Sequence, residues 1–350
     1  MKLADYTTIG LGGPARDFVP AHNEADLVRA VQAADARGEP VLILGGGSNL
    51  VVADEGFDGT VIQVLTRGLS RAGEPGLVTV AAGEPWDDVV AWTVEAELAG
   101  LECLSGIPGL AGATPIQNVG AYGQEVSQTI TQVRAYDRTA GQILAIPGSQ
   151  CGFGYRTSRF RRPGGRFVVL SVTFRLAEEP VSAPVGYAEL AAALGVAIGD
   201  RVPGRRARKA VLELRRRKGM VIDPADPDTR SVGSFFVNPV LDGAGLAAVE
   251  TAAQARCGAG TAVPRFDAGD GLVKVPAAWL IERAGFGKGF SLSDGDPGAR
   301  ISSKHALALV NSGSATTADL MTLARQIRDG VRGAFGVSLT PEPDLVGVAL

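Results

Sequence analysis

Two glycine-rich stretches constrain the fold of this chain more than any other feature. The first, "VLILGGGSN" at 41–49, places three glycines directly after a short apolar run that predicts a buried strand. The second, "GIPGLAGATPIQNVGAYGQE" at 106–125, spaces five glycines among small and amide residues. Because glycine has no Cβ, its backbone can approach another group closely. We therefore expect both stretches to pack against a large ligand.

The first stretch has the chemistry of an anion site. Successive backbone N–H groups can form a concavity for a phosphate, and Ser48 and Asn49 can add side-chain hydrogen bonds. The spacing is not that of a dinucleotide-binding fingerprint, because Leu50 replaces the third glycine, and it is not that of a P-loop. Taken alone, the stretch is explained equally well by an ordinary turn.

The second stretch adds the amide side chains of Gln117 and Asn118 to its small residues. Amides on an extended backbone suit a ring system that is rich in hydrogen-bond donors and acceptors. A ligand that needs both a pyrophosphate site and a ring site must be long. The pair of stretches therefore favours a dinucleotide such as FAD over a smaller ligand.

Composition narrows the class of protein. The chain has 350 residues, 45% of them hydrophobic, which is enough for two or three cores. Its formal net charge of −3 gives no reason to expect nucleic acid or an anionic membrane as a partner. Three scattered cysteines predict a reducing compartment, and neither a secretory signal nor a membrane-spanning run is present. We expect a cytoplasmic protein.

Histidine is scarce, and this restricts the chemistry. The only two are His22 and His305. A Ser-His-Asp hydrolase would need one of them as its base, and the G-x-S-x-G pattern does not surround Ser234 in "RSVGSFFVNPV". A multi-histidine metal site is not expected either.

Periodicity along the chain predicts an α+β fold. Helical spacing marks 23–38, 85–100 and 316–336, whereas "RTAG" at 138–141 predicts the turn of a β-hairpin. The stretch "ISSKHALALVN" at 301–311 is predicted as one strand. Pro203 and Gly204 separate two helical stretches, so a domain boundary is predicted near 200.

A basic run occupies 205–218. Such a run is commonly the solvated face of a helix, but arginine and lysine also supply the donors that a diphosphate needs. Composition alone does not decide between these alternatives. The run contains Arg205, Arg206, Arg208, Lys209, Arg215, Arg216, Arg217 and Lys218.

Five stretches together resemble the UDP-N-acetylenolpyruvoylglucosamine reductase (MurB) family. They are "TTIGLGGPA", "LILGGGSNLVV", "GIPGLAGATPIQNVGAYGQE", "GYRTSRF" and "GSFFVNPV", in the order of that family, and the resemblance extends from about residue 6 to about 347. It implies a vanillyl-alcohol-oxidase-type FAD fold of two subdomains, 1–66 and 67–204, followed by a UDP-sugar-binding domain at 205–330. It also implies that the tail, 331–350, returns to the first subdomain.

The resemblance implies an activity as well. NADPH reduces FAD, hydride passes from flavin N5 to C3 of the enolpyruvyl ether, and a protein acid protonates C2 to give UDP-N-acetylmuramate, a peptidoglycan precursor. The cofactors would be FAD and NADPH, and the partners only small molecules, with the chain a monomer. The residues implied to bind the cofactor are Gly45, Gly46, Gly47, Ser48, Asn49, Pro108, Gly109, Gly112, Ala113, Gln117, Asn118, Gly120, Ala121 and Tyr122.

Three residues match the catalytic positions of the family. Ser234 matches the proton donor, Arg156 the arginine that contacts the enolpyruvyl group, and Glu342 a carboxylate that polarises the substrate or moves the proton. Each also has an ordinary alternative. Ser234 could cap a turn, Arg156 could be one arginine of a basic loop, and Glu342 could be a solvated tail carboxylate.

Five further residues match substrate contacts: Tyr187, Lys218, Asn238, Lys288 and His305. Tyr187 matches the subgroup whose tyrosine loop closes over the diphosphate, and Lys218 matches a lysine that pairs with it. A buried histidine without a ligand explains His305 equally well.

The tail departs from the family pattern. A basic residue usually follows "PEP", but Asp344 stands there, so no second tail contact is transferred.

Two other functions stay open: a flavoprotein of the same fold that oxidises another alcohol or sugar, and a non-catalytic regulator that binds flavin or a nucleotide sugar.

Overall fold

The computed structural model describes residues 1–71, 73–161, 165–293 and 298–350 of the chain. These residues form two compact units, each built from separate segments of the sequence. Unit 1 contains Met1, Ala15–Gly47 and Asp58–Val221. Unit 2 contains Lys2–Pro14, Ser48–Phe57 and Ile222–Leu350. The chain has mixed helix and strand content, as the α+β prediction requires.

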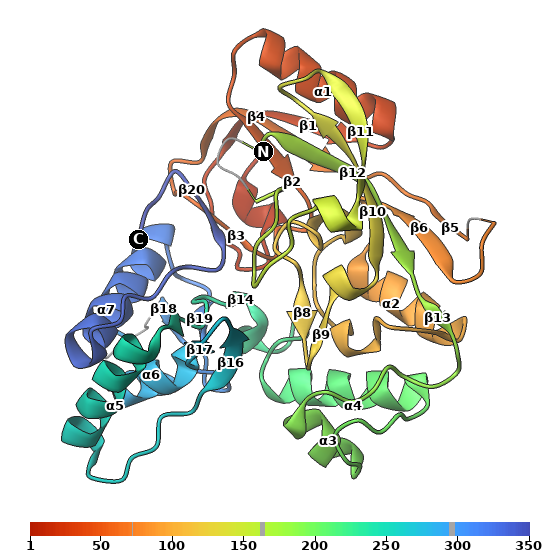
Figure 1. Cartoon of the computed structure of the whole chain (residues 1–350). Coiled ribbons are helices and arrows are strands. Elements are labelled where there is room, and N and C mark those ends of the chain that lie inside the picture. Colours follow the sequence, from red (N-terminus) through yellow and green to blue (C-terminus); the bar gives the residue numbers. More distant parts are fainter. Residues whose placement is uncertain (72, 162–164, 294–297) are drawn as a thin grey trace. The chain divides into compact units, whose positions relative to one another are not determined.

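Unit 1 begins with a small sheet of three strands in the order β1-β4-β2, of which β2 and β4 run parallel. Helix α1 lies beside β1 (Figure 1). Asn23 caps this helix by accepting from Asp26 N–H at 2.9 Å, and Leu27, Val31 and Ala34 form its buried stripe. The elements are β1 (Ala15–Ala21), α1 (Glu24–Ala36), β2 (Val41–Leu44) and β4 (Phe57–Val64).

The second sheet of unit 1 has five strands in the order β11-β10-β12-β6-β5, and each strand runs antiparallel to its neighbours. The predicted hairpin turn at 138–141 is confirmed, because Asp137 pairs with Gln142 across it. The strands are β5 (Leu69–Arg71), β6 (Leu77–Ala81), β10 (Ile130–Asp137), β11 (Gln142–Pro147) and β12 (Phe167–Arg175).

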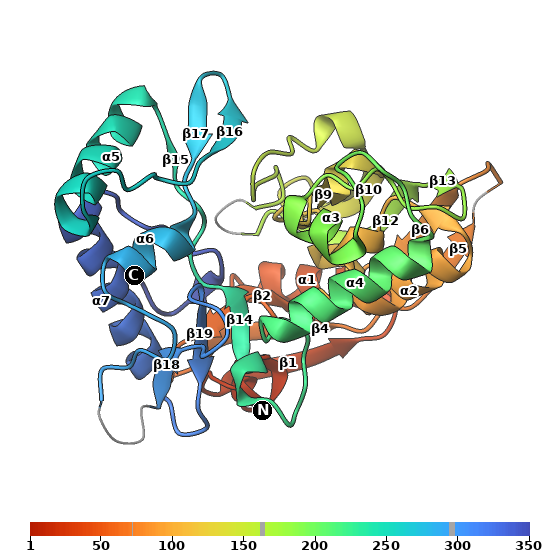
Figure 2. The ribbon, with the colours of Figure 1, turned by 90° about the horizontal axis from the view of Figure 1, so that it is seen from below.

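Helices cover this sheet and extend unit 1. Trp86, Val89 and Val90 of α2 pack with the sheet residues in one apolar core. Side chains of α3 and α4 form a second, separate core. Helices α2, α3 and α4 lie together in both ribbon views (Figures 1 and 2). The helices are α2 (Trp86–Glu95), α3 (Ala188–Leu194) and α4 (Gly204–Arg217), with short 3-10 turns at Glu102–Leu104, Ala111–Ala113, Val126–Gln128 and Gly148–Gln150. The remaining short strands are β7 (Leu98–Ala99), β8 (Gly120–Ala121), β9 (Gln124–Glu125) and β13 (Ala177–Glu178).

Unit 2 contains two small antiparallel sheets, β14-β19-β18 and β15-β17-β16, and three helices. Helix α7 packs against both α5 and α6, and all three contribute to one apolar core (Figure 2). The strands are β14 (Ser231–Ser234), β15 (Val240–Leu241), β16 (Phe266–Gly269), β17 (Leu272–Lys274), β18 (Ala299–Ile301) and β19 (Ala308–Asn311). The helices are α5 (Gly243–Cys257), α6 (Ala277–Arg283) and α7 (Thr317–Phe335), with 3-10 turns at Leu3–Tyr6 and Pro227–Thr229.

Two early segments of the chain belong to unit 2. Asn311 donates to Ile9 O at 3.0 Å, and the Asp54 carboxylate accepts from Thr317 N–H at 2.8 Å at the start of α7. The tail strand β20 (Asp344–Val346) pairs in parallel with β3 (Leu50–Val52). The C-terminal tail therefore packs against residues 50–52.

The chain leaves unit 1 at residue 221 and enters unit 2 at residue 222, which is later than the boundary predicted near 200. The physical reason is the buried face of α4, which packs Ala207, Val211 and Leu214 into the core that it shares with α3. Helix α4 therefore lies in the same compact unit as the two glycine-rich stretches. The division into three functional domains stays a prediction.

The prediction of one strand over 301–311 is wrong. Strand β18 ends at Ile301, and β19 begins only at Ala308. The buried hydroxyl of Ser302 accepts from Lys304 N–H at 3.0 Å and from His305 N–H at 3.3 Å, which turns the chain between the two strands.

Of the helices that the structure describes, none is long and apolar enough to cross a membrane.

Candidate active site

The two glycine-rich stretches lie in contact within unit 1. A Cβ at Gly46 would lie 2.9 Å from Gly109 Cα, closer than a side chain can approach a backbone. Gly47 has φ +61°, and Gly112 packs against Ala82, where a Cβ would meet the alanine Cβ at 2.5 Å. Pro108 directly precedes Gly109, Ala113 directly follows Gly112, and Gly109 O accepts from Trp86 N–H at 3.0 Å. Glycine is therefore required here by close backbone approach.

The loop after β2 presents hydrogen-bond donors. Within the part of the chain that the structure describes, the N–H groups of Gly46, Gly47 and Ser48 donate to no protein acceptor. Consecutive donors of this kind are the groups that a pyrophosphate would satisfy. The loop therefore fits the pyrophosphate of FAD, and Gly45, which precedes these donors, lies against Leu110 of the second stretch.

The second stretch ends in a tight hairpin. Strands β8 and β9 are joined by Tyr122 and Gly123, whose φ values of +50° and +86° suit a two-residue hairpin turn. Asn118, which is buried and has φ +45°, donates to Glu125 Oε2 at 2.8 Å and accepts from Ser127 N–H at 3.1 Å. Its amide is thus used to hold the hairpin. Gln117 is buried next to it, and Gly120 and Ala121 form β8.

Arg156 is anchored on this hairpin. Its Nη2 donates to Gly120 O at 2.9 Å, and its Nη1 lies 3.5 Å from Asn118 O. Arg156 also has φ +53°, a conformation that an L residue with a side chain rarely adopts. The structure therefore brings the predicted catalytic arginine to the predicted cofactor loop. Such backbone strain is typical of functional sites.

Tyr187 and Lys218 meet at the same hairpin. Tyr187 precedes α3 and packs edge-on against Tyr122, with ring centroids 5.7 Å apart and planes at 87°. Lys218, at the end of α4, places Nζ 5.7 Å from the Tyr122 centroid. Lys218 Nζ also donates to Glu189 Oε2 at 2.6 Å. The two predicted substrate contacts thus share one cluster with a predicted cofactor residue and an acid that the sequence analysis did not select.

Burial shapes the ionisation of this cluster. Burial raises the pKa of Tyr122 to about 12, with Arg215 opposing the shift and Glu189 adding to it. Burial, followed by the charge of Glu189, also raises the pKa of Tyr187. Both phenols therefore stay protonated at neutral pH and can donate hydrogen bonds. Arg215 is buried deeply enough that its pKa falls to about 10, although Tyr122 and Asp87 oppose the shift.

Several cations of the basic run already form hydrogen bonds with other groups of the protein. Arg208 holds Asp87 through two hydrogen bonds of 2.6 and 2.9 Å, and Arg215 donates to Met220 O at 2.8 Å. Burial alone would raise the pKa of Asp87, but its hydrogen bonds from Arg208 and Gly106 lower it. These contacts fix α4 to the rest of unit 1.

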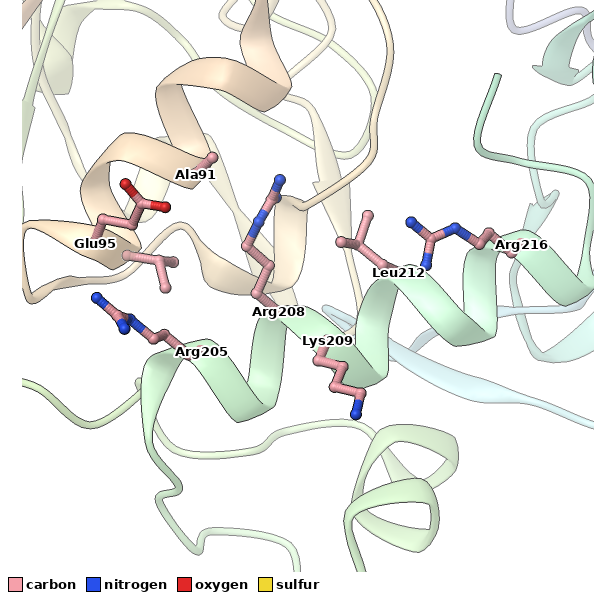
Figure 3. A pocket seen from close by; sticks show the side chains of 8 residues that line it. Ala91, Glu95, Arg205, Arg208, Lys209, Leu212 and Arg216 are labelled. Carbon is pink, nitrogen blue, oxygen red and sulfur yellow. The ribbon is translucent and has the colours of Figure 1, made fainter. Parts of the chain in front are cut away.

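Other cations of the run line a shallow hollow between α2 and α4 with a volume of about 330 Å³. Figure 3 shows Arg208 pointing from α4 toward α2, whereas Lys209 points to the opposite side. Arg205 and Lys209 are exposed to solvent. The run is therefore partly structural and partly a solvated face, and Lys218 is the member that reaches the tyrosine cluster.

Ser234 and the tail come together in unit 2. Ser234 ends β14, follows Gly233 at φ +74°, and is half-buried. Directly after it, Phe235 O accepts from Glu342 N–H at 2.9 Å. Phe235 and Phe236 are fully buried and contact each other edge-on with centroids 5.1 Å apart, which fixes the backbone after Ser234.

Asn49 ties the tail to the end of the first glycine-rich stretch. Asn49 O accepts from Asp344 N–H at 3.0 Å, and Asn49 Nδ2 lies 3.5 Å from Glu342 O. Asp344, the residue that departs from the family pattern, is exposed and begins β20. Its backbone therefore has a structural task in docking the tail.

Three predicted substrate contacts lie elsewhere in unit 2. Asn238 Oδ1 accepts from Ala277 N–H at 2.8 Å at the start of α6, so this oxygen has a structural use. Lys288 is exposed between α6 and β18. His305 is half-buried in the turn after Ser302, where its carbonyl accepts from Ala308 N–H at 3.1 Å. Their roles toward a substrate stay predictions.

Glu189 and Asp87 are the residues that sequence reasoning missed. Glu189 follows Tyr187 by two positions, but nothing in the sequence shows that it meets Lys218, 29 residues later. An acid in the first turn of a short helix is common because it favours the helix dipole. This signal alone would not have singled it out.

Two sequence families match separate parts of the chain. Residues 15–146 match a family described as FAD binding domain. Residues 224–346 match the UDP-N-acetylenolpyruvoylglucosamine reductase, C-terminal domain. The first match contains both glycine-rich stretches, and the second contains Ser234 and Glu342.

Relatives of similar length match the whole chain. The UDP-N-acetylenolpyruvoylglucosamine reductase of Salinispora arenicola is 57% identical over 353 residues, which cover 99% of this chain and 95% of the relative. That of Streptomyces coelicolor is 55% identical over 349 residues, which cover 99% of this chain and 90% of the relative.

A solved structure is also similar to this chain over nearly its whole length. The crystal structure of UDP-N-acetylenolpyruvylglucosamine reductase (MurB) from Thermus caldophilus is 26% identical, with a TM-score of 0.67 over 99% of this chain and 97% of that chain. The expected family and its FAD-binding α+β fold are thus confirmed. The chain belongs to the UDP-N-acetylenolpyruvoylglucosamine reductase family.

Proposed function

We propose that this chain reduces the enolpyruvyl ether of UDP-N-acetylglucosamine enolpyruvate to the lactyl ether of UDP-N-acetylmuramate, a step of peptidoglycan precursor synthesis. The observation that carries the proposal is the docking of the tail, in which Glu342 N–H binds the carbonyl directly after Ser234. This contact holds Glu342 to Phe235, the residue after Ser234, and Ser234 and Glu342 are the two residues that match the proton-handling positions of the family. The substrate in this proposal is taken from the names of the full-length relatives.

When bound, FAD would supply the hydride, which it first receives from NADPH. The residues that would hold it are the donors of the 45–49 loop and the small and amide residues of the 106–125 stretch. The loop's N–H groups suit the pyrophosphate.

Hydride addition at C3 of the substrate leaves negative charge at C2, delocalised into the neighbouring carboxylate. The enzyme must stabilise this anion and then protonate it. In the proposal, Ser234 Oγ donates the proton to C2. An ordinary serine is a very weak acid, so Ser234 needs a partner that favours its alkoxide, and Glu342 is proposed to orient the hydroxyl or the substrate.

Arg156 is proposed to bind the substrate carboxylate, because its forked guanidinium matches a carboxylate or an enolate. Its contacts with Gly120 O and Asn118 O hold the group in place. Lys218 and the phenol of Tyr187 are proposed to receive the diphosphate of the substrate. Asn238, Lys288 and His305 are proposed as further substrate contacts. The protein is proposed to act as a cytoplasmic monomer.

The proton-donor assignment predicts that Ser234→Ala separates the two half-reactions. NADPH should still reduce the flavin at nearly the wild-type rate, because that step needs no proton from Ser234. Reoxidation of the flavin by the enolpyruvyl substrate should slow by about 10²- to 10⁴-fold. Stopped-flow absorbance at the flavin band measures both steps separately.

Ser231→Ala is the matched control, because Ser231 lies on the same strand and its hydroxyl accepts from Gly233 N–H at 3.2 Å. It should keep both half-reactions within a few-fold of wild type. A Ser234→Ala enzyme that turned over the substrate within a few-fold of wild type would contradict the assignment. Oxidation of simple alcohols by the wild-type flavin would favour the oxidase alternative. Flavin binding without any half-reaction would favour a regulator.

A further inference from the structure

We propose that Glu189 sets the affinity for substrate by acting as an internal counter-ion: it holds Lys218 in the ligand-free enzyme and is exchanged for the substrate diphosphate on binding. This inference rests on the proposed function, in which Lys218 contacts that diphosphate. It assigns a role to an acid that neither the family resemblance nor the motifs selected.

The ion pair is short and links two helices. Lys218 Nζ donates to Glu189 Oε2 at 2.6 Å, and the two side chains are 34% and 39% exposed. Glu189 lies in the first turn of α3, whereas Lys218 is the residue at the C-terminal end of α4. Helices α3 and α4 lie side by side in both ribbon views (Figures 1 and 2).

A diphosphate cannot use Lys218 without disturbing this pair. Glu189 already neutralises the ammonium, and a phosphate that approached the same Nζ would bring two negative groups close together. Binding must therefore either displace the carboxylate or pay for the repulsion. Both routes make the carboxylate a competitor of the substrate, so its charge lowers the affinity.

The surrounding tyrosines direct the exchange. Lys218 Nζ lies over the Tyr122 ring, and Tyr122 packs edge-on against Tyr187. Burial, with the charge of Glu189 adding to it, raises the pKa of both phenols, so their hydroxyl groups stay protonated and the Tyr187 hydroxyl can donate to phosphate oxygens. Glu189 is only two residues from Tyr187, so a movement of the start of α3 would shift both residues together.

The pair is not needed to hold the helices. An ion pair exposed to this extent contributes little to folding stability. The helices are held instead by buried side chains of α3 and α4, among them Leu190, Leu194 and Val211. Two hydrogen bonds from Arg208 to Asp87 also fix α4 to α2. A substitution at Glu189 is therefore expected to leave the fold intact.

The test is Glu189→Gln, which keeps the shape of the side chain and removes its charge. Its dissociation constant for UDP, the probe for the diphosphate, should fall by about three- to tenfold, since a weak competing ion pair is removed. Isothermal titration calorimetry measures this binding without turnover. The KM for the enolpyruvyl substrate should fall similarly, while kcat stays within about twofold.

Two further variants complete the test. Glu213→Gln removes an exposed acid of α4 and should leave UDP binding unchanged. Lys218→Ala should weaken UDP binding, and adding Glu189→Gln to it should have no further effect, because the counter-ion acts only through that lysine. Thermal melts of all variants report whether each one folds.

The outcomes separate this inference from the proposed function. If Glu189→Gln leaves UDP affinity unchanged or weakens it, while Lys218→Ala weakens binding and the wild type turns over the substrate, the counter-ion role is overturned and the function stands. If Lys218→Ala does not affect UDP binding, the diphosphate assignment and the counter-ion role both fail. Tighter binding by Glu189→Gln that disappears in the Lys218→Ala background supports the inference.

Discussion

Three residues of unit 1 carry unusual backbone conformations at the predicted site. Asn118, Tyr122 and Arg156 have φ values of +45°, +50° and +53°. Each such residue costs on the order of 1 kcal/mol, so its surroundings must hold it there. Hydrogen bonds from Arg156 to the carbonyls of Gly120 and Asn118 hold two of them, Arg156 and Asn118. The strained residues coincide with positions that the family resemblance selected for cofactor binding and catalysis.

The contact between Gly46 and Gly109 predicts the effect of one methyl group. In Gly46→Ala the new Cβ would lie 2.9 Å from Gly109 Cα, a backbone atom that cannot rotate away. The two loops must separate, so we expect FAD content to fall by about tenfold or more and the free energy of unfolding to decrease by about 1–3 kcal/mol. The ratio of flavin to protein absorbance after purification measures the first effect, and urea unfolding the second.

Gly243→Ala is the matched control for this change. Gly243 begins α5, and a Cβ there would meet nothing within 4 Å. The control should keep wild-type FAD content and stability. Full FAD content in Gly46→Ala would show that the loops can separate without harm, and the close-approach argument would then be wrong.

At the scale of elements, the sequence predicted the helices and strands that are determined by their own residue pattern. Apolar residues at helical spacing and an Asn23 cap mark α1, and a Thr316 cap with a terminal Gly336 marks α7, so both were predictable. The 301–311 stretch was not, because its β-like composition is overridden by hydrogen bonds to the Ser302 hydroxyl. The pairing of β20 with β3, nearly 300 residues apart, left no local signal at all.

The predicted site was recognisable for a different reason. Glycine patterns and family motifs identified loops and side chains, but not the contacts among them. Arg156 and Tyr122 have positive φ values that their residue types do not suggest, whereas Asn118 belongs to a type that tolerates them. The partner of Lys218 was equally hidden, because an ion pair between two helices depends on their packing.

The β10–β11 hairpin gives a prediction about pH. Arg166 holds Asp137 through hydrogen bonds of 2.9 and 2.7 Å, and these, against the effect of burial, lower the pKa of Asp137 to about 2. Because the folded-state pKa lies below the unfolded value of about 3.9, the stabilisation is complete above about pH 5 and is lost as pH falls toward 2. Asp137→Asn should therefore lower Tm by about 2–5 °C at pH 7 and by progressively less below pH 5.

Differential scanning fluorimetry from pH 7 to pH 3 checks this dependence. Asp58→Asn is the control, because Asp58 also pairs with an arginine, Arg16, but its side chain is 92% exposed. Such an exposed pair should contribute almost nothing to Tm at any pH. A constant Tm difference between Asp137→Asn and wild type across the range would argue against the role of the Asp137 charge.

At the scale of the whole molecule, each compact unit is assembled from distant segments. Unit 2 takes 2–14 and 48–57 from the start of the chain and packs them with residues 222–350. The first glycine-rich stretch is divided by this arrangement, because Gly47 ends a segment of unit 1 and Ser48 begins a segment of unit 2. Of the residues assigned to the proposed function, Arg156 and Lys218 belong to unit 1, and Ser234 and Glu342 belong to unit 2.

We assign this chain as a flavin-dependent reductase of the enolpyruvyl UDP-sugar, and an anaerobic flavin spectrum tests this claim most directly. The purified protein should be yellow, NADPH should bleach the flavin band, and the enolpyruvyl substrate should restore it with one equivalent of UDP-N-acetylmuramate formed per flavin. A protein without flavin, or a reduced flavin that the enolpyruvyl substrate fails to reoxidise, would contradict the claim.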